Sequence, residues 1–246
     1  TFDFSILGAT TTTVSNGDQI SFDVADASLL DGYYTLGINA VFFFDSNNTG
    51  GGTWGTAGTW ASNSVPTNSD DVNVLGTDSV TVSGAGNVGS TLGIQGTAQV
   101  NINSGATLTI SNGVTVNTGT LTVDGTLAAS SVAVGGTGTL TGTSGLDLSG
   151  AGTTTVTAGT VTANGALNIG ANTYNVNGGT TTATSITRTS GGVALGGGTL
   201  TVDTINSTDI SGSVGAGSTL NVNTLLTLDA ANLNTTGATL NTTGAT

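Results

Sequence analysis

Apolar and small polar residues alternate in one short motif that returns along the second half of the chain. The motif places an apolar residue between two threonines, as in "GTLTVDG" (119–125) and "GTLTGTS" (138–144). Later copies are "GTVTANG" (159–165), "GTTTATS" (179–185), "GTLTVDT" (198–204), "STLNVNT" (218–224) and "ATLNTTG" (238–244). Alternation with period two on β-branched residues predicts a short strand with one buried and one exposed face, and it excludes a helix.

The spacing between the copies predicts how these strands are arranged. Their central positions are Leu121, Leu140, Val161, Thr181, Leu200, Leu220 and Leu240, which gives steps of 19, 21, 20, 19, 20 and 20 residues. A fixed period in this range is typical of a solenoid, in which each repeat buries its apolar face by stacking on its neighbours.

Each repeat carries two further apolar segments after the motif. One follows as "LDLS" (146–149), "LNIG" (167–170) and "LLTL" (225–228); the other contains Val132, Val134, Val156, Tyr174, Val176, Val193, Leu195 and Ile210. Glycine, asparagine and serine between the segments suit tight corners, because they tolerate positive φ or form local side-chain hydrogen bonds. We therefore predict an all-β fold, a parallel β-solenoid with three short strands per coil of about 20 residues.

The earlier copies leave the register open. "STLGIQG" (90–96) and "ATLTISN" (106–112) contain the motif, but the steps from Leu92 to Leu108 and from Leu108 to Leu121 are 16 and 13 residues. Either these coils are shorter, or the motif here lies on another side of the solenoid.

The first part of the chain has a different composition. Ten of the eleven aromatic residues precede residue 61: Phe2, Phe4, Phe22, Tyr33, Tyr34, Phe42, Phe43, Phe44, Trp54 and Trp60. We predict an aromatic-rich N-terminal β cap or docking unit over 1–50, a tryptophan-containing leading segment over 51–78, and the solenoid over 79–246. A solenoid needs a cap because its open end presents unpaired strand edges.

Charge restricts the partners. The net charge is −13, and Arg188 is the single basic residue. Such a chain repels phosphate backbones and anionic lipid surfaces, so we expect no nucleic-acid partner.

No apolar run reaches the length of a membrane span. The start at Thr1 without Met suits a processed secreted protein or a fragment, and the Gly, Thr, Asn, Ser, Val and Ala-rich composition favours an extracellular bacterial surface protein.

Candidate catalytic chemistry is sparse. A polysaccharide lyase needs a base that the chain lacks, since it has one arginine, no lysine and no histidine. A glycosidase needs two carboxylates about 5 to 9.5 Å apart, whereas Asp124 and Asp203 are four coils apart, about 19 Å at the usual strand spacing. We predict that the protein is not an enzyme.

Calcium is the one cofactor for which the sequence offers ligands. Asp70 and Asp71 with Asp78, or Asp18 with Asp23 and Asp26, supply hard oxygen atoms. Solvated turn aspartates are the favoured alternative.

Arg188 is either a solvated surface residue, the favoured interpretation, or one half of a salt bridge to an aspartate of an adjacent coil or subunit.

The stretch "GGTWGTAGTWASNSVPTNSDDVNV" (51–74) carries a more specific signal. Its paired tryptophans, its proline and its aspartate pair resemble the opening of repeat regions in large secreted bacterial surface proteins; the matching positions are Trp54, Trp60, Pro66, Asp70 and Asp71. Together with the solenoid, the chain resembles autotransporter-passenger and filamentous-haemagglutinin-like proteins, especially those with autotransporter-associated β-strand repeats. The resemblance implies a right-handed parallel β-helix at the cell surface that acts as a stalk, adhesin or filament.

Three functions follow as hypotheses. The leading one is a structural stalk or filament subunit that joins copies of itself head to tail, with Phe2, Phe4 and Ile6 of "TFDFSIL" as an inserting strand and Leu240 in the coil that receives it. The second is an adhesin that grips surface glycan with Trp54 and Trp60; exposed tryptophans favour it, and buried ones favour a cap. The third is ice binding by outward threonine columns, which comprise Thr120, Thr122, Thr139, Thr141, Thr160, Thr162, Thr180, Thr182, Thr199 and Thr201.

Overall fold

The structure is a computed structural model that describes residues 43–227 and 235–243. Within these ranges the regular structure is almost entirely β, joined by two short 3₁₀ turns, η3 (Ala57–Thr59) and η4 (Ser207–Asp209). The ten-stranded sheet contains, in spatial order, β1 (Phe43–Asp45), β3 (Asp71–Val74), β6 (Thr91–Ile94), β8 (Thr107–Val116), β10 (Thr126–Val134), β13 (Ala151–Val156), β16 (Thr173–Val176), β18 (Gly192–Leu195) and β20 (Ile210–Val214), with β5 (Asn87–Gly89) paired to β8. The twelve-stranded sheet contains β2 (Gly51–Thr53), β4 (Ser79–Val82), β7 (Gln99–Ile102), β9 (Thr120–Val123), β11 (Thr139–Gly142), β14 (Thr160–Ala163), β17 (Thr180–Arg188), β19 (Thr199–Asn206), β21 (Thr219–Thr227) and β22 (Thr239–Thr242), with β12 (Leu146–Asp147) and β15 (Ala166–Gly170) paired beside them.

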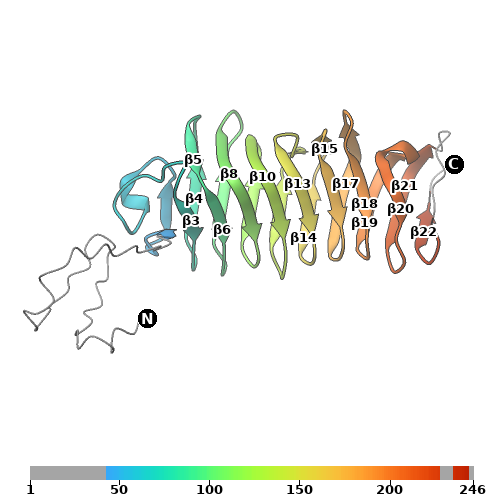
Figure 1. Cartoon of the computed structure of the whole chain (residues 1–246), viewed down its shortest axis with the longest axis horizontal. Coiled ribbons are helices and arrows are strands. Elements are labelled where there is room, and N and C mark those ends of the chain that lie inside the picture. Colours follow the sequence, from blue (N-terminus) through green and yellow to red (C-terminus); the bar gives the residue numbers. More distant parts are fainter. Residues whose placement is uncertain (1–42, 228–234, 244–246) are drawn as a thin grey trace, which may run out of the picture. The chain divides into compact units, whose positions relative to one another are not determined.

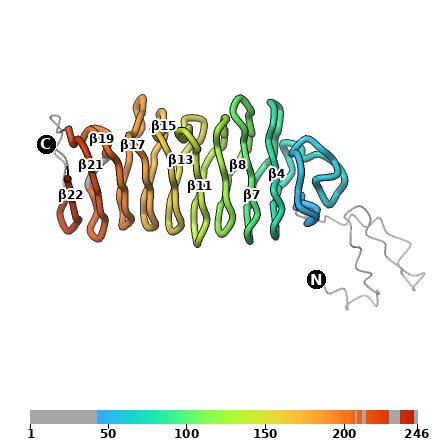
Figure 2. The backbone as a smooth tube through the Cα atoms, turned by 180° about the vertical axis from the view of Figure 1, so that it is seen from behind, coloured from blue at the N-terminus to red at the C-terminus, as the bar shows by residue number. Residues whose placement is uncertain are grey.

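Neighbouring strands in both sheets belong to successive coils and run parallel. Leu121, for example, lies beside Leu140, which lies beside Val161. The coils follow one another in chain order from β3 to β22 (Figure 1), and the view from behind shows the same succession (Figure 2). The prediction of an all-β parallel β-solenoid is therefore confirmed, with about eight turns and three strands per coil. The right-handed winding stays a prediction.

Several long strands cover two sides of a coil because they bend at a corner. In β10, residues 126–129 pair with 107–110 of β8 and residues 131–134 pair with 113–116, with a register shift between the two parts. β17 turns in the same way, since its first half pairs with β14 and its second half with β15. Each coil thus has three sides, although its strands belong to two sheets.

The core is a stack of inward side chains. In the twelve-stranded sheet the inward column runs through Val80, Val100, Leu121, Leu140, Val161, Thr181, Leu200 and Leu220, all fully buried. Burial of each Leu or Val side chain contributes roughly 1.5–3 kcal/mol, and only stacking on the next coil provides that burial.

The irregular early copies lie on the other two sides of the solenoid. Leu92 in β6 and Leu108 in β8 are both in the ten-stranded sheet, where Leu92 pairs with Val72 and Val114. The twelve-stranded sheet keeps its period, because Val80, Val100 and Leu121 are register partners. The second of the two interpretations is correct, and the early coils are not shortened.

The solenoid begins earlier than residue 79. One compact unit extends from Phe43 to the end of the chain. β1 and β2 are the first strands of the two sheets, and β2 pairs with β4. Residues 43–78 therefore form the first coil and not a separate leading segment. Residues 1–42, and with them most of the proposed cap, lie outside the described residues.

Candidate functional site

The outward side of the twelve-stranded sheet carries the predicted threonine columns in register. Thr120, Thr139, Thr160, Thr180 and Thr199 form one column of Cα partners. Thr122, Thr141, Thr162, Thr182 and Thr201 form a second column beside it. We call these ten residues, which lie on β9, β11, β14, β17 and β19, the threonine face.

The hydroxyls of this face have almost no protein partners. In the described part of the chain only Thr201 of the ten makes a side-chain hydrogen bond, which it accepts from Asn221 Nδ2 at 3.1 Å. The second column then continues as asparagine, and Asn241 Nδ2 donates to Asn221 Oδ1 at 2.8 Å. The face is uncharged and offers hydroxyl and methyl groups to solvent.

Both tryptophans belong to the core of the first coil. Trp54 is 0% and Trp60 is 2% exposed, and their rings meet edge to face with centroids 5.1 Å apart. Trp60 Nε1 donates to the Trp54 carbonyl oxygen at 2.8 Å, and Phe44 packs against Trp60. A buried indole cannot stack on a sugar ring, so the interpretation of Trp54 and Trp60 as a glycan contact is wrong. The alternative, an aromatic cap over the end of the core, describes their position.

The same segment closes the edge of the first coil. Asn47 N donates to the Thr59 carbonyl at 3.0 Å, and Ala61 N donates to the Asp45 carbonyl at 2.9 Å, so this segment runs antiparallel to β1. The Thr59 hydroxyl also donates to the Thr53 carbonyl of β2 at 2.8 Å. An edge strand that is already hydrogen-bonded cannot add another strand, which is how natural proteins prevent edge-to-edge association.

The aspartates proposed as calcium ligands have structural partners instead. Asp78 is fully buried, and its two carboxylate oxygens accept hydrogen bonds from Asn48 N at 2.7 Å and Gly50 N at 2.8 Å. Asp70 accepts from the Thr67 backbone and hydroxyl, and Asp71 from the Thr91 hydroxyl. No three acidic side chains gather into a metal-binding group within the described ranges. The site formed by Asp70, Asp71 and Asp78 is therefore not assembled; Asp18, Asp23 and Asp26 lie outside the described residues.

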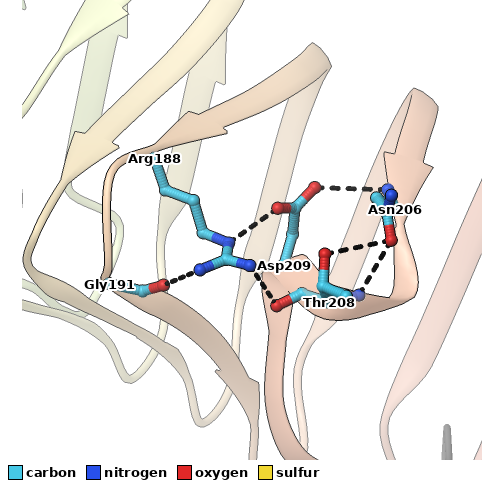
Figure 3. Close-up of polar contacts among 5 residues, drawn as sticks. All are labelled: Arg188, Gly191, Asn206, Thr208 and Asp209. Atoms are coloured by element: carbon cyan, nitrogen blue, oxygen red, sulfur yellow. Dashed lines mark hydrogen bonds and ion pairs between the residues drawn. The ribbon is translucent and has the colours of Figure 1, made fainter. Parts of the chain in front are cut away.

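Arg188 links two coils. Its Nε lies 2.7 Å from Asp209 Oδ1, and its two terminal nitrogens donate to the carbonyls of Gly191 at 3.0 Å and Thr208 at 2.6 Å (Figure 3). Asp209 Oδ2 accepts from Asn206 N at 3.2 Å. The favoured expectation of a solvated arginine was wrong, because β17 ends where η4 of the next coil presents a carboxylate and a free carbonyl.

A buried hydroxyl pair was not anticipated from the sequence. Tyr174 and Thr181 are both 0% exposed, and their hydroxyl oxygens are 2.9 Å apart. Burial raises the pKa of the Tyr174 phenol above its usual value, and the hydrogen bond with Thr181 offsets part of that rise. The signal was present, since Thr181 interrupts an otherwise aliphatic column.

The last described strand, β22, is exposed, whereas the edge of the first coil is covered. Among the described residues β22 pairs with a single strand, β21, and all four of its residues are exposed. Leu240 is 38% exposed, whereas its counterpart Leu220 is buried. Phe2, Phe4 and Ile6, the proposed inserting strand, lie outside the described residues.

Comparison with models of protein families, with curated proteins and with solved structures finds no match to this chain. The structure supports a β-helix repeat protein, and the autotransporter type rests on the sequence motifs alone. No helix in the described ranges is long and apolar enough to cross a bilayer.

Proposed function

We propose that this chain is a non-enzymatic structural protein of a bacterial cell surface, a stalk or filament subunit built from stacked coils. The observation that carries the proposal is the continuous pairing of the twelve-stranded sheet, in which each strand on the path from β2 to β22 hydrogen-bonds the next strand of that path. Such a stack holds a fixed length because each coil in the described ranges is bound to its neighbours.

Side chains on the outside tie the coils together as well. Asp124 accepts hydrogen bonds from Thr143 N and its hydroxyl, and Asn223 Nδ2 donates to Asp203 at 3.1 Å; each pair joins successive coils. These polar contacts between successive coils support a mechanical role over a catalytic one. The resemblance of 51–74 to surface repeat proteins supports the same placement outside the cell.

In the proposed filament, a second copy of the chain binds at β22. The first coil is closed by Thr59 and its neighbours, whereas β22 pairs with β21 alone among the described residues and its Leu240 is exposed. We propose that the segment containing Phe2, Phe4 and Ile6 of another copy adds to β22 as a parallel or antiparallel strand.

Sedimentation velocity of the full chain at rising concentration tests this. Leu240→Asp places a charge in the receiving strand and is expected to abolish association. Leu225→Asp is the matched control, because Leu225 is 45% exposed but lies on β21. Equal behaviour of the two variants, or a wild-type chain that stays monomeric at all concentrations, would overturn end-to-end assembly.

A further inference from the structure

The threonine face directs its hydroxyls at solvent and not at neighbouring coils. Some outward polar side chains elsewhere do hydrogen-bond across coils, for example Asn112 to Ser90, Asn168 to Asp147, and Arg188 to Asp209. Nine of the ten hydroxyls on the threonine face have no side-chain partner within the described chain. Their hydrogen-bonding capacity is directed at solvent.

Strand propensity does not explain the regularity of this face. The same five coils have an outward column on the ten-stranded sheet, and that column is mixed: its register partners are Thr115, Ala133, Thr155, Asn175 and Ala194. Threonine suits an exposed strand position equally on either sheet. Repetition of whole coils copies all three sides together, so an unbroken double column on one side alone indicates a requirement on that side.

The geometry of the face is that of a two-dimensional lattice. Successive coils of a parallel sheet are about 4.8 Å apart, and residues i and i+2 of a strand are about 6.6 Å apart. Ten hydroxyl and ten methyl groups repeat at these two spacings over five coils. Since each threonine lies beside its Cα partner, both spacings are held by the backbone ladder.

We propose that the threonine face binds ice. The hydroxyls donate to and accept from water at regular intervals, and the methyls between them favour an ordered water layer over a liquid one. Charged groups, which hold their own hydration shells, are absent from both columns. A crystalline polysaccharide is the other regular, uncharged surface, but such a ligand calls for aromatic rings on the binding face, and neither threonine column contains one.

The test is thermal hysteresis and partition of the full chain into a slowly growing ice front. The wild-type chain is expected to shape ice crystals into facets and to concentrate in the ice. Thr162→Tyr inserts a bulky ring in the middle of the face and is expected to reduce hysteresis at least tenfold. Thr155→Tyr is the matched control, because Thr155 is an outward threonine of similar exposure in a nearby strand on the ten-stranded sheet, and it is expected to keep wild-type activity.

Two milder variants separate the roles of the groups: Thr162→Val keeps the methyl and removes the hydroxyl, and Thr162→Ser does the reverse. Circular dichroism establishes that each variant is folded. A folded wild-type chain that is excluded from ice like an inert control protein would overturn the proposal, as would equal losses in Thr162→Tyr and Thr155→Tyr, or retention on crystalline cellulose or chitin without any effect on ice. These measurements do not depend on self-association, so failure here leaves the stalk proposal in place.

Discussion

The hydroxyl of Tyr174 meets the hydroxyl of Thr181 at 2.9 Å inside the core of the solenoid. Each residue departs from its own column, since Thr181 lies between Val161 and Leu200, and Tyr174 lies beside Val193. Each hydroxyl is the hydrogen-bond partner of the other, and both residues are fully buried. The two departures from the repeat are therefore one feature of the packing.

Removing one partner of this pair is expected to cost more than removing both. Tyr174→Phe leaves the Thr181 hydroxyl buried without a partner and should lower the free energy of unfolding by about 1–3 kcal/mol. Tyr174→Phe combined with Thr181→Val removes both polar groups and should recover most of that loss. Denaturant unfolding followed by circular dichroism measures the difference, and a double variant less stable than the single one would contradict the pairing.

Alkaline pH is expected to destabilise the solenoid through Tyr174. Because burial raises the pKa of this phenol in the folded state, the folded chain holds the proton more tightly than the unfolded chain. This contribution to stability is complete below the unfolded pKa of about 10 and is lost as pH rises through the folded value. Unfolding measured from about pH 8 to 12 should show a steeper alkaline loss in the wild type than in Tyr174→Phe; parallel curves would refute the assignment.

Trypsin is a local probe of the Arg188 linkage. Arg188 is the single site at which trypsin can cleave this chain, and its side chain is held by Asp209 and two carbonyls. Asp209→Asn removes the charge but keeps the shape, so we expect stability to fall by about 1–3 kcal/mol and cleavage to accelerate. Asp203→Asn is the control, since Asp203 bonds only to Asn223 among the described side chains. Equal cleavage rates in the two variants would show that the ion pair does not protect the site.

Asp78 is expected to hold the first coil closed. Asp78→Ala leaves the backbone N–H groups of Asn48 and Gly50 without their acceptor, at a cost of about 3 kcal/mol. Hydrogen exchange should accelerate in residues 43–61 and stay unchanged in residues 120–202, because opening of one coil is local. Asp71→Ala, which removes one bond to the Thr91 hydroxyl, should have little effect. Uniform acceleration along the whole chain would contradict a local cap.

The repeating part of the fold follows from the sequence for a simple reason. An inward residue such as Leu140 is buried only by its counterparts one period away, so the period fixes both the partner strand and the face. The threonine columns followed from the same rule. The motif around Leu92 and Leu108 gave no such answer, because all three sides of a coil bury apolar residues and the motif alone does not identify the side.

The residues that interrupt the repeat were not predictable in the same way. Asp209, the partner of Arg188, lies 21 positions away in the next coil, and the partners of Asp78 lie 28 and 30 positions away at the start of the first coil. No local pattern encodes those contacts. The sequence around Trp54 and Trp60 is compatible with a cap, the favoured interpretation, and with a sugar platform. The burial of both rings and the antiparallel backbone bonds between this segment and β1 show that it closes the end of the core.

Negative-stain electron microscopy of the purified full chain at rising concentration tests the central claim most directly. The account predicts unbranched filaments whose axial repeat equals the length of one subunit, shorter or absent in Leu240→Asp and unchanged in Leu225→Asp. Single particles of one length at every concentration, with both variants indistinguishable from the wild type, would contradict it.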